Sequence, residues 1–266
     1  FISGGDHDLT ENIVHLVLAR TPGSPTGTKG LSLFIVPKFN YDPKTLALGE
    51  RNGAYVLRIE EKMGIHGSCT CVLGLGQSGP CRGVMVGGEH QGIALMFEMM
   101  NEARIGVGMQ GVATATAAYQ YALHYANDRL QGPSMRDARD PNARSVLIKE
   151  HPDVRRMLMT LKVQAETLRA LGYRIHLEFD LAHGVTDPEV AARHARRVDL
   201  LTPVVKSMAT DLGFESACTA VQVYGGYGFI SEYPVEQLVR DAKIQSIYEG
   251  TNGIQSLDLI GRKLRI

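Results

Sequence analysis

The sequence predicts an α+β protein, in which a truncated antiparallel β-domain is followed by an all-α antiparallel helical bundle. Up to about Val86, short segments rich in β-branched residues alternate with turn clusters, which is typical of antiparallel strands. From Gly92 onward, apolar residues recur at helical spacing in long segments. We therefore expect a β-domain over residues 1–88 and a helical bundle over residues 89–266.

Four segments of the first part are predicted to form strands. Turn clusters such as TPGSPTGTKG and GQSGP separate them, because Gly and Pro favour tight turns. The predicted strands are Ile13–Ala19, Leu31–Val36, Tyr55–Glu60 and Cys71–Leu75.

The helical part is predicted to begin at Gly92. The first helix runs to about Asp128, where the QGPS stretch ends it, and its apolar face includes Arg104. A second helix begins near His151 and carries a core stripe. The stripe consists of Val154, Met157, Leu158, Leu161, Ala165, Leu168 and Leu171.

Three further helices complete the predicted bundle. The first of them begins with Thr186 or Asp187 as its N-cap and Pro188 in the first turn, and we expect it to break near Gly213. After the glycine-rich stretch YGGYGF, a short helix begins at EYPVEQL. The last helix follows from TNGIQSLDLIGRKL.

The composition excludes several classes of function. Lys+Arg and Asp+Glu number 28 each, so the charge gives no sign of nucleic acid or an anionic membrane as a partner. No segment approaches the roughly 20 apolar residues of a membrane-spanning helix. The cysteines form no Cys-x-x-Cys pair and have no paired histidines beside them. We interpret them as free thiols in a reducing compartment, with no metal site: Cys69, Cys71, Cys81 and Cys218.

The stretch SIYEGTNGIQ places the acidic Glu249 between an aromatic residue and a glycine. One interpretation is structural: Glu249 lies near the start of the last helix, where the helix dipole stabilises it, and Thr251 caps that helix. The other is catalytic. With Tyr248 and Gly250 beside it, the carboxylate could face an apolar pocket and act as a general base toward a weakly acidic carbon-bound proton.

Other segments also allow a structural and a ligand-binding interpretation. The glycines of QVYGGYGF allow a simple turn or close contact with a planar or phosphate-bearing ligand. Arg129 either complements a helix dipole or binds a phosphate. Asn101 and Arg104 share one helical face, and Arg104 needs either an anionic partner or an exposed head group.

Together these segments resemble the acyl-CoA dehydrogenase family. GGYGFISEYPVEQLVRDAKIQSIYEGTNGIQ carries the most specific similarity, and NEARIGVGMQGVA, YANDRLQG, KMGIHGSCTC and FISGG are similar to other family segments. The insert MRDARDPNARSVLIKEHPDVRRM is similar to the larger bacterial members, of the methylthiopropanoyl-CoA dehydrogenase type. The resemblance covers essentially the whole chain.

The resemblance implies FAD-dependent α,β-dehydrogenation of an acyl-CoA thioester. Glu249 would remove the α-proton, and the β-hydride would pass to flavin N5. The backbone N–H of Glu249, with a flavin hydroxyl, would stabilise the enolate-like oxygen. Asn101, Arg104, Tyr248 and Gly250 would lie on the substrate side.

The resemblance also implies partners and cofactor contacts. An electron-transferring flavoprotein would accept the electrons, and the protein would form a homodimer or homotetramer. Arg129 and Gln131 would reach the flavin pyrophosphate across a dimer interface. The other implied FAD contacts are Phe1, Ser3, His151, Gln222, Gly225, Gly226 and Thr251.

Some features depart from the family pattern. Phe1 stands where tryptophan is usual, Asn101 replaces a common aspartate, Pro152 replaces a common glutamine, and Gly253 replaces a residue that often contacts flavin. The family's N-terminal helical domain and the first part of its β-domain are absent, and larger members continue past Ile266, so we interpret the chain as a fragment. Alone, it is expected to form an oligomeric helical bundle with an irregular or displaced β-part, and to bind FAD weakly or not at all. The expected location is the bacterial cytoplasm, with the mitochondrial matrix as the alternative.

Two other functions stay open at this point. An acyl-CoA oxidase uses the same base but lets oxygen reach the reduced flavin, and the sequence does not separate it from a dehydrogenase. A cofactor-free helical assembly module, or an inactive fragment of the family, would have kept the fold alone. The presence of Glu249 argues against that second alternative.

Overall fold

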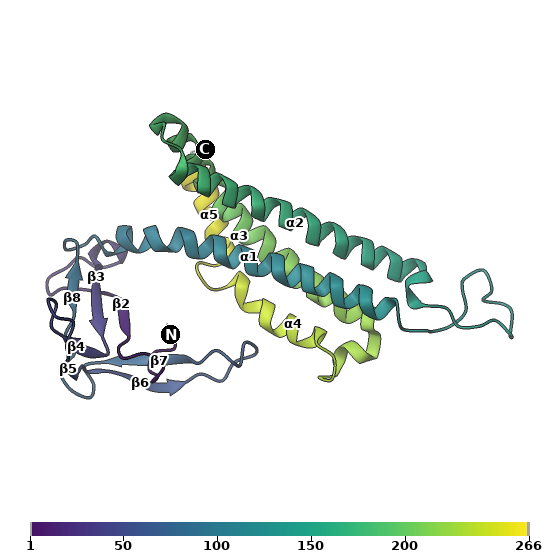
Figure 1. Cartoon of the computed structure of the whole chain (residues 1–266), viewed down its shortest axis with the longest axis horizontal. Helices are drawn as coiled ribbons and strands as arrows, with labels where there is room; N and C mark the ends of the chain where they lie inside the picture. Colours follow the sequence, from purple (N-terminus) through teal and green to yellow (C-terminus); the bar gives the residue numbers. More distant parts are fainter. Residues whose placement is uncertain (1, 265–266) are drawn as a thin grey trace. The chain divides into compact units, whose positions relative to one another are not determined.

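The structure is a computed structural model that describes residues 2–264; Phe1 and residues 265–266 lie outside the described part. The chain divides into two compact units, Phe1–Met100 and Asn101–Ile266 (Figure 1). The first unit holds antiparallel strands and the second holds helices, so the predicted α+β class is confirmed. Helix α1 (Gly92–Ala126) begins in the first unit and continues into the second. The expected division of the chain after residue 88 stays a prediction.

The strands described in the first unit form three antiparallel sheets (Figure 1). One has the order β1-β7-β6, one has the order β2-β3-β8, and β4 and β5 form a pair. The strands are β1 (Ile2–Ser3), β2 (Val14–Ala19), β3 (Ser32–Pro37), β4 (Phe39–Tyr41), β5 (Leu48–Arg51), β6 (Ala54–Ile59), β7 (Thr70–Leu75) and β8 (Val84–Val86).

All four predicted strands are present as β2, β3, β6 and β7, each displaced by at most about one residue. The sequence did not indicate β4, β5 and β8, because segments this short show too few alternations for a period of two. Pairing of β2 with β3 is continuous from Val14–Pro37 to Ala19–Ser32. Register shifts occur in β4 and in β6. The pairing within this unit is therefore continuous in one strand pair and irregular in two others.

The second unit contains long helices joined by turns and loops. The remaining α-helices are α2 (Pro152–Gly184), α3 (Pro188–Tyr224), α4 (Val235–Ala242) and α5 (Asn252–Asp258). Asp187 is the N-cap of α3, because its Oδ1 accepts from the N–H groups of Glu189 (2.9 Å) and Val190 (3.3 Å). Of the two predicted caps, the structure therefore selects Asp187 over Thr186.

The predicted break of the third helix near Gly213 is wrong, because α3 continues to Tyr224. A Cβ atom on Gly213 would lie 2.7 Å from the backbone oxygen of Gly111, and one on Gly111 would lie 2.3 Å from that of Ala209. Both positions are thus glycine because α1 and α3 approach each other too closely for a side chain. A packing requirement, and not a helix end, explains Gly213.

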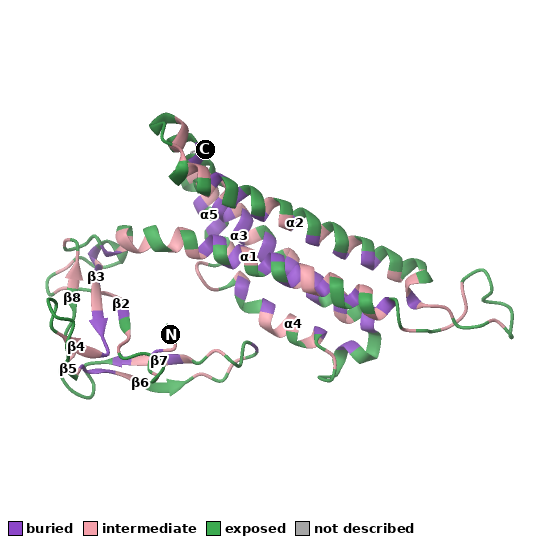
Figure 2. Cartoon of the chain, in the orientation of Figure 1, coloured by how far each residue is buried: buried purple, intermediate pink, exposed green. Residues whose placement is uncertain are grey.

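In the second unit, the residues coloured as buried lie where the helices face one another (Figure 2). The predicted stripe of α2 is confirmed. Val154 and Leu171 are partly buried and pack against core clusters. The buried members are Met157, Leu158, Leu161, Ala165 and Leu168. Each large apolar side chain buried in this way contributes roughly 1.5–3 kcal/mol.

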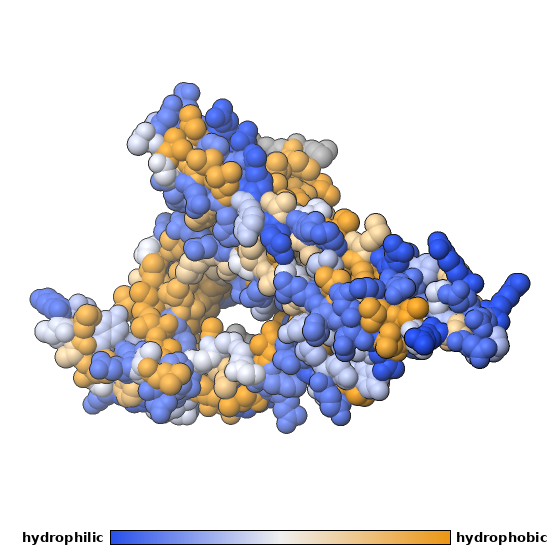
Figure 3. All heavy atoms as spheres, turned by 45° about the vertical axis from the view of Figure 1, so that its right-hand side comes forward, coloured by the Kyte–Doolittle hydropathy of each residue, from blue (hydrophilic) through white to orange (hydrophobic). Residues whose placement is uncertain are grey.

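Hydrophobic side chains also lie on the surface, interspersed with hydrophilic ones (Figure 3). Near the end of the chain, the exposed apolar residues are Ile244, Ile247, Ile254, Leu257, Ile260 and Leu264. Apolar surface of this kind favours contact with other protein, and the homo-oligomer stays a prediction. Within residues 2–264, none of the helices combines the length and the apolar character that crossing a bilayer requires.

Candidate active site

Glu249 lies in a turn that connects a 3-10 segment (Lys243–Ser246) to α5. Glu249 and Gly250 are consecutive residues in the left-handed region, with φ of 55° and 87°. A left-handed conformation costs a residue other than glycine about 1–2 kcal/mol. Such strain persists where surrounding contacts enforce it, and it is frequent at active sites. Thr251 then caps α5, as the structural interpretation expected, because its Oγ1 accepts from the N–H of Ile254 at 3.3 Å, and its contact with FAD stays a prediction.

Buried side chains hold the backbone of this turn. Arg104 Nε donates to the main-chain oxygen of Glu249 at 3.2 Å, and Gln255 Nε2 donates to that of Gly250 at 3.1 Å. Gln255 is fully buried, and a Cβ atom on Gly250 would lie 2.8 Å from its Nε2. The turn therefore needs glycine at position 250 for space as well as for conformation.

Of the two alternatives left open for Arg104, the structure shows the anionic partner. Its Nη1 lies 3.7 Å from Oδ2 of Asp258, and both side chains are buried. Asp258 also accepts from Nε of Arg262 at 2.5 Å. Burial lowers the pKa of Arg104, and the charge of Asp258 opposes that effect. Arg104 thus supports the backbone of Glu249; its predicted contact with the substrate stays a prediction.

The side chain and the N–H of Glu249 are available to a ligand. Glu249 is half-buried, and within residues 2–264 neither its carboxylate nor its N–H has a hydrogen-bond partner. The Tyr248 hydroxyl bonds with Oε1 of Gln110, and burial raises the pKa of Tyr248. Asn101 is half-buried and lies one helical turn before Arg104 on α1. A free carboxylate, a free N–H and a fixed backbone therefore coincide at one residue.

A second group of predicted residues gathers at the other end of the bundle. The guanidinium carbon of Arg129 lies 5.1 Å from the ring centroid of Tyr227, and Nε2 of His151 bonds with the main-chain oxygen of Gln131 at 2.7 Å. Tyr227 belongs to the glycine turn Gly225–Phe229, which follows Gln222 at the end of α3. A helix rises about 1.5 Å per residue, so Arg104 lies roughly 33 Å along α1 from Ala126. The predicted flavin-pyrophosphate residues are thus remote from Glu249 within one chain.

This second group fits a phosphate-bearing cofactor such as FAD. No carboxylate of residues 2–264 forms an ion pair with Arg129, so its guanidinium donors remain available while it stacks on Tyr227. A Cβ atom on Gly225 or Gly226 would meet nothing within 4 Å, so a ligand can approach the backbone there. Gly225 also has φ of 61°, a conformation suited to glycine.

The two remaining predicted flavin contacts belong to the start of the chain. Ser3 lies in β1 opposite Thr70, and its Oγ accepts from Oγ of Ser68 at 3.2 Å. The other predicted contact, Phe1, lies outside the described residues. The structure therefore places Ser3 on a paired strand of the first unit, and its role toward a flavin stays a prediction.

Two residues near Glu249 were not predicted from the sequence. Lys206 of α3 is fully buried, and its Nζ lies 2.9 Å from Oδ1 of Asn252. Burial is the main cause that lowers the pKa of Lys206 to about 8. The signal for Lys206 was a lysine within the apolar stretch PVVKSMA. Among the described residues, no group of three or more His, Cys, Asp or Glu side chains could hold a metal ion.

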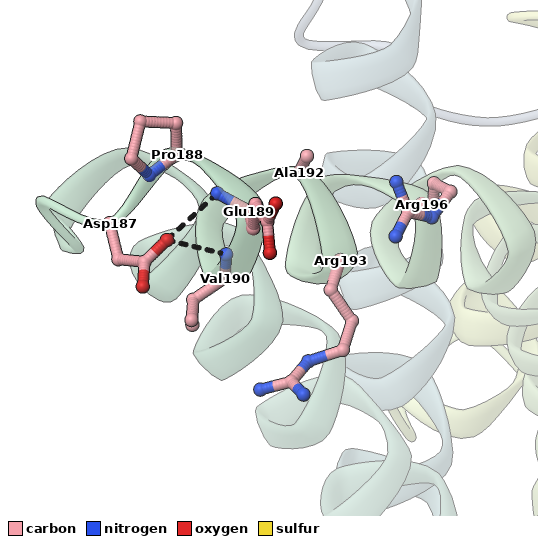
Figure 4. Close-up of a pocket in the computed structure, with 7 residues that line it drawn as sticks. All are labelled: Asp187, Pro188, Glu189, Val190, Ala192, Arg193 and Arg196. Carbon is pink, nitrogen blue, oxygen red and sulfur yellow. Dashed lines mark hydrogen bonds between the residues drawn. The ribbon is translucent and has the colours of Figure 1, made fainter.

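The surface also has pockets away from these residues. One pocket, of about 510 Å³, lies at the start of α3, where the cap made by Asp187 is visible and Arg193 and Arg196 line the wall (Figure 4). Another, in the first unit, is lined by Gly4, Gly5 and Lys38. None of the predicted site residues lines either pocket.

One family model and two similar proteins all point to the acyl-CoA dehydrogenases. The family model "Acyl-CoA dehydrogenase, C-terminal domain" matches residues 90–264. The chain is 48% identical over 267 residues to the broad-specificity linear acyl-CoA dehydrogenase FadE5 of Mycobacterium tuberculosis, covering 99% of this chain and 44% of the relative. It is 46% identical over 273 residues to the 3-methylmercaptopropionyl-CoA dehydrogenase of Ruegeria pomeroyi, again covering 99% and 44%. The chain thus spans less than half the length of these relatives.

Solved structures with a similar fold support the same family. An acyl-CoA dehydrogenase complexed with FAD from Bacillus anthracis matches 95% of this chain and 40% of its own, with a TM-score of 0.73 and 26% identity. A chain from the structure of the electron-transferring flavoprotein of Acidaminococcus fermentans matches all of this chain and 59% of its own, with a TM-score of 0.74 and 26% identity. By the extent of the family match and the identity to the bacterial enzymes, the chain belongs to the acyl-CoA dehydrogenase family.

Proposed function

We propose that this chain carries the base of an FAD-dependent acyl-CoA dehydrogenase, and that Glu249 removes the α-proton of an acyl-CoA thioester. The proposal rests on the hydrogen bonding of Glu249. Its carboxylate has no hydrogen-bond partner within residues 2–264, whereas its backbone is held by the buried Arg104. A free acceptor on a fixed backbone is preorganised for proton transfer.

Glu249 and the residues around it would have separate roles in substrate binding and proton transfer. The Glu249 carboxylate accepts the α-proton, and its free N–H donates to the thioester oxygen, where negative charge develops. Tyr248 and Gly250 line the acyl chain, and Asn101 and Arg104 lie toward the substrate. FAD, when bound, supplies the hydride acceptor.

The second group of residues would hold the cofactor of a partner subunit. Arg129 offers its guanidinium to the pyrophosphate, and the open backbone beside Gly225 and Gly226 admits the ligand. The separation of roughly 33 Å along α1 between the two groups supports a division between subunits of a homodimer or homotetramer. The proposed FAD contacts in full are Phe1, Ser3, Arg129, Gln131, His151, Gln222, Gly225, Gly226 and Thr251.

The proposed partners follow from the same function. The substrate is an acyl-CoA, and an electron-transferring flavoprotein accepts the electrons; the fold shared with a chain from the Acidaminococcus fermentans structure supports that choice of acceptor. The bacterial relatives support a bacterial enzyme, for which the cytoplasm remains the predicted location.

The test replaces Glu249 with glutamine in the FAD-loaded protein. The amide keeps the shape of the side chain but accepts no proton, so we expect bound flavin to be unchanged and turnover to fall by about 10²–10⁴-fold or more. Bleaching of the flavin absorbance by acyl-CoA measures the reduction of the flavin by the substrate. Glu215→Gln, at an exposed position of α3, is the matched control and should react like the parent. Near-normal bleaching in Glu249→Gln would return Glu249 to a structural role.

Two alternatives have separate tests. An acyl-CoA oxidase would consume oxygen at the same rate with and without an added electron acceptor, whereas a dehydrogenase would depend on the acceptor. A cofactor-free assembly module would show no flavin absorbance even when the full-length protein is reconstituted with FAD. The free carboxylate of Glu249 favours the dehydrogenase or the oxidase over the module.

A further inference from the structure

A fully buried lysine lies beside the turn that carries Glu249. Lys206 is 0% exposed, and its Nζ donates to Oδ1 of Asn252 at 2.9 Å. Asn252 is the first residue of α5 and lies three positions after Glu249. An ammonium is costly to bury without a partner, so its presence here requires a reason beyond packing.

The Asn252 amide lies between opposite charges. Its Oδ1 faces the Lys206 ammonium, and its Nδ2 donates to Oδ1 of Asp211 at 2.7 Å. Nδ2 also donates to Oγ1 of Thr210 at 3.0 Å. A flipped amide would place its NH₂ group against the ammonium and its oxygen against the carboxylate, so the charges define one orientation. Asn252 thereby ties the start of α5 to α3.

We propose that Lys206 is a positioning residue for the base: through Asn252 its ammonium holds the turn that presents Glu249 to the substrate. This inference rests on the proposed function of Glu249. Arg104 holds the turn from its N-terminal side, at the Glu249 oxygen. Lys206 and Asn252 hold it from the C-terminal side, at the first residue of α5. The turn needs both anchors because Glu249 keeps a left-handed backbone between them.

The charge of Lys206 makes this anchor sensitive to pH. The charged groups that act on it are Asp211 and Glu249, which favour the ammonium, and Arg104, which opposes it. Burial outweighs the attraction and lowers the pKa of Lys206 to about 8. Above this pH the ammonium loses its charge, and the charge-assisted hydrogen bond to Asn252 weakens. The rate of flavin reduction should then fall as pH rises through about 8.

The test compares Lys206→Met with the parent in the FAD-loaded protein, by the rate of flavin bleaching with acyl-CoA from pH 6.5 to 9.5. We expect Lys206→Met to retain flavin and to react about 10- to 100-fold more slowly, the range that misplacement of a reacting group causes. Its rate should also lose the decline near pH 8 that the parent shows. Asn252→Leu, which removes the same link from the other side, should give the same result, so the test does not depend on one variant folding.

A structural control separates positioning from stability. Ser216 is fully buried, and Ser216→Ala removes its 2.8 Å hydrogen bond to Oε1 of Gln164 on α2, which does not involve the turn. It should lower the free energy of unfolding without changing the pH dependence. A parent without a decline near pH 8, or a Lys206→Met variant with the parent's rate and profile, overturns the role of Lys206. If Glu249→Gln is inactive in the same series, the proposed function stands regardless.

Discussion

Arg104 and Glu249 lie 145 positions apart in the sequence, yet Nε of Arg104 donates to the main-chain oxygen of Glu249 at 3.2 Å. The same guanidinium lies 3.7 Å from the carboxylate of Asp258. One buried side chain therefore joins α1 to the turn before α5 and to the end of α5. The turn that carries the proposed base depends on a residue from a distant helix.

Two replacements of Arg104 should distinguish the effect of its positive charge from the effect of its planar hydrogen-bonding geometry. Arg104→Lys keeps a cation near Asp258 but lacks the planar fork, so flavin should stay bound while turnover falls about 10- to 100-fold. Among residues 2–264, Arg104→Leu leaves Asp258 with Arg262 as its one ion-pair partner, and the free energy of unfolding should fall by about 3–5 kcal/mol. Flavin bleaching measures the first effect and urea denaturation the second. Full activity of Arg104→Lys would show that the bond to Glu249 is dispensable.

Arg129 tests the proposed cofactor group. Arg129→Ala should lower flavin occupancy far more than it lowers the thermal stability of the apo-protein, because an arginine that only complements a helix dipole contributes about 0.3–1 kcal/mol. The ratio of flavin to protein absorbance gives the occupancy. Arg136→Ala, at an exposed position in the loop between α1 and α2, is the control. Equal flavin content in the parent and both variants would favour the structural interpretation.

Replacing two glycines of the bundle with alanine should change the free energy of unfolding in opposite directions. Gly213→Ala would place a Cβ atom 2.7 Å from the backbone oxygen of Gly111, so the helices must separate and the free energy of unfolding should fall by about 1–3 kcal/mol. Gly106→Ala, in α1, meets nothing within 4 Å and should raise the free energy of unfolding by about 0.5–1 kcal/mol. Urea denaturation of both variants checks the pair. A neutral Gly213→Ala would contradict the close approach of α1 and α3.

The buried carboxylate of Glu178 should make the free energy of unfolding depend on pH in acid. Glu178 is 1% exposed and bonds with His194 at 2.5 Å and with Arg174 and Arg197. The hydrogen bond with His194 is the main cause that lowers the pKa of Glu178. A lowered pKa means that the unfolded chain binds the proton more readily, so this contribution to stability is complete above the unfolded pKa of about 4.3. It is lost as pH falls further, through the folded pKa.

The experiment measures the free energy of unfolding between pH 7 and pH 3. Glu178→Gln should be less stable than the parent at pH 7, and the difference should shrink as the solution becomes acidic. Glu166→Gln removes the exposed pair with Lys162, which is worth at most about 1 kcal/mol, and serves as the control. A difference for Glu178→Gln that stays constant down to pH 3 would mean that the Glu178 charge does not contribute.

Much of the fold could be read from local patterns. The β-branched composition of β2, β3, β6 and β7 and the apolar stripe of α2 are properties of short segments, so their elements were predicted to within a few residues. The cap at Asp187 was also local, since side chain and N–H groups are neighbours in sequence. Gly213 was misjudged because the reason for a glycine there lies on another helix.

The sequence by itself determined the α+β class, the helical periodicity, the position of Glu249 in its turn and the similarity to acyl-CoA dehydrogenases, because each of these is carried by contiguous residues. Only the tertiary structure decided what surrounds Glu249. Arg104, Lys206 and Asn252 come from three different helices, and their hydrogen bonds to or beside the turn exist only once those helices pack. The same holds for the partner of Arg104, since burial removes water and leaves Asp258 to balance the charge. Local pattern encodes which elements form, and long-range packing decides which polar groups meet.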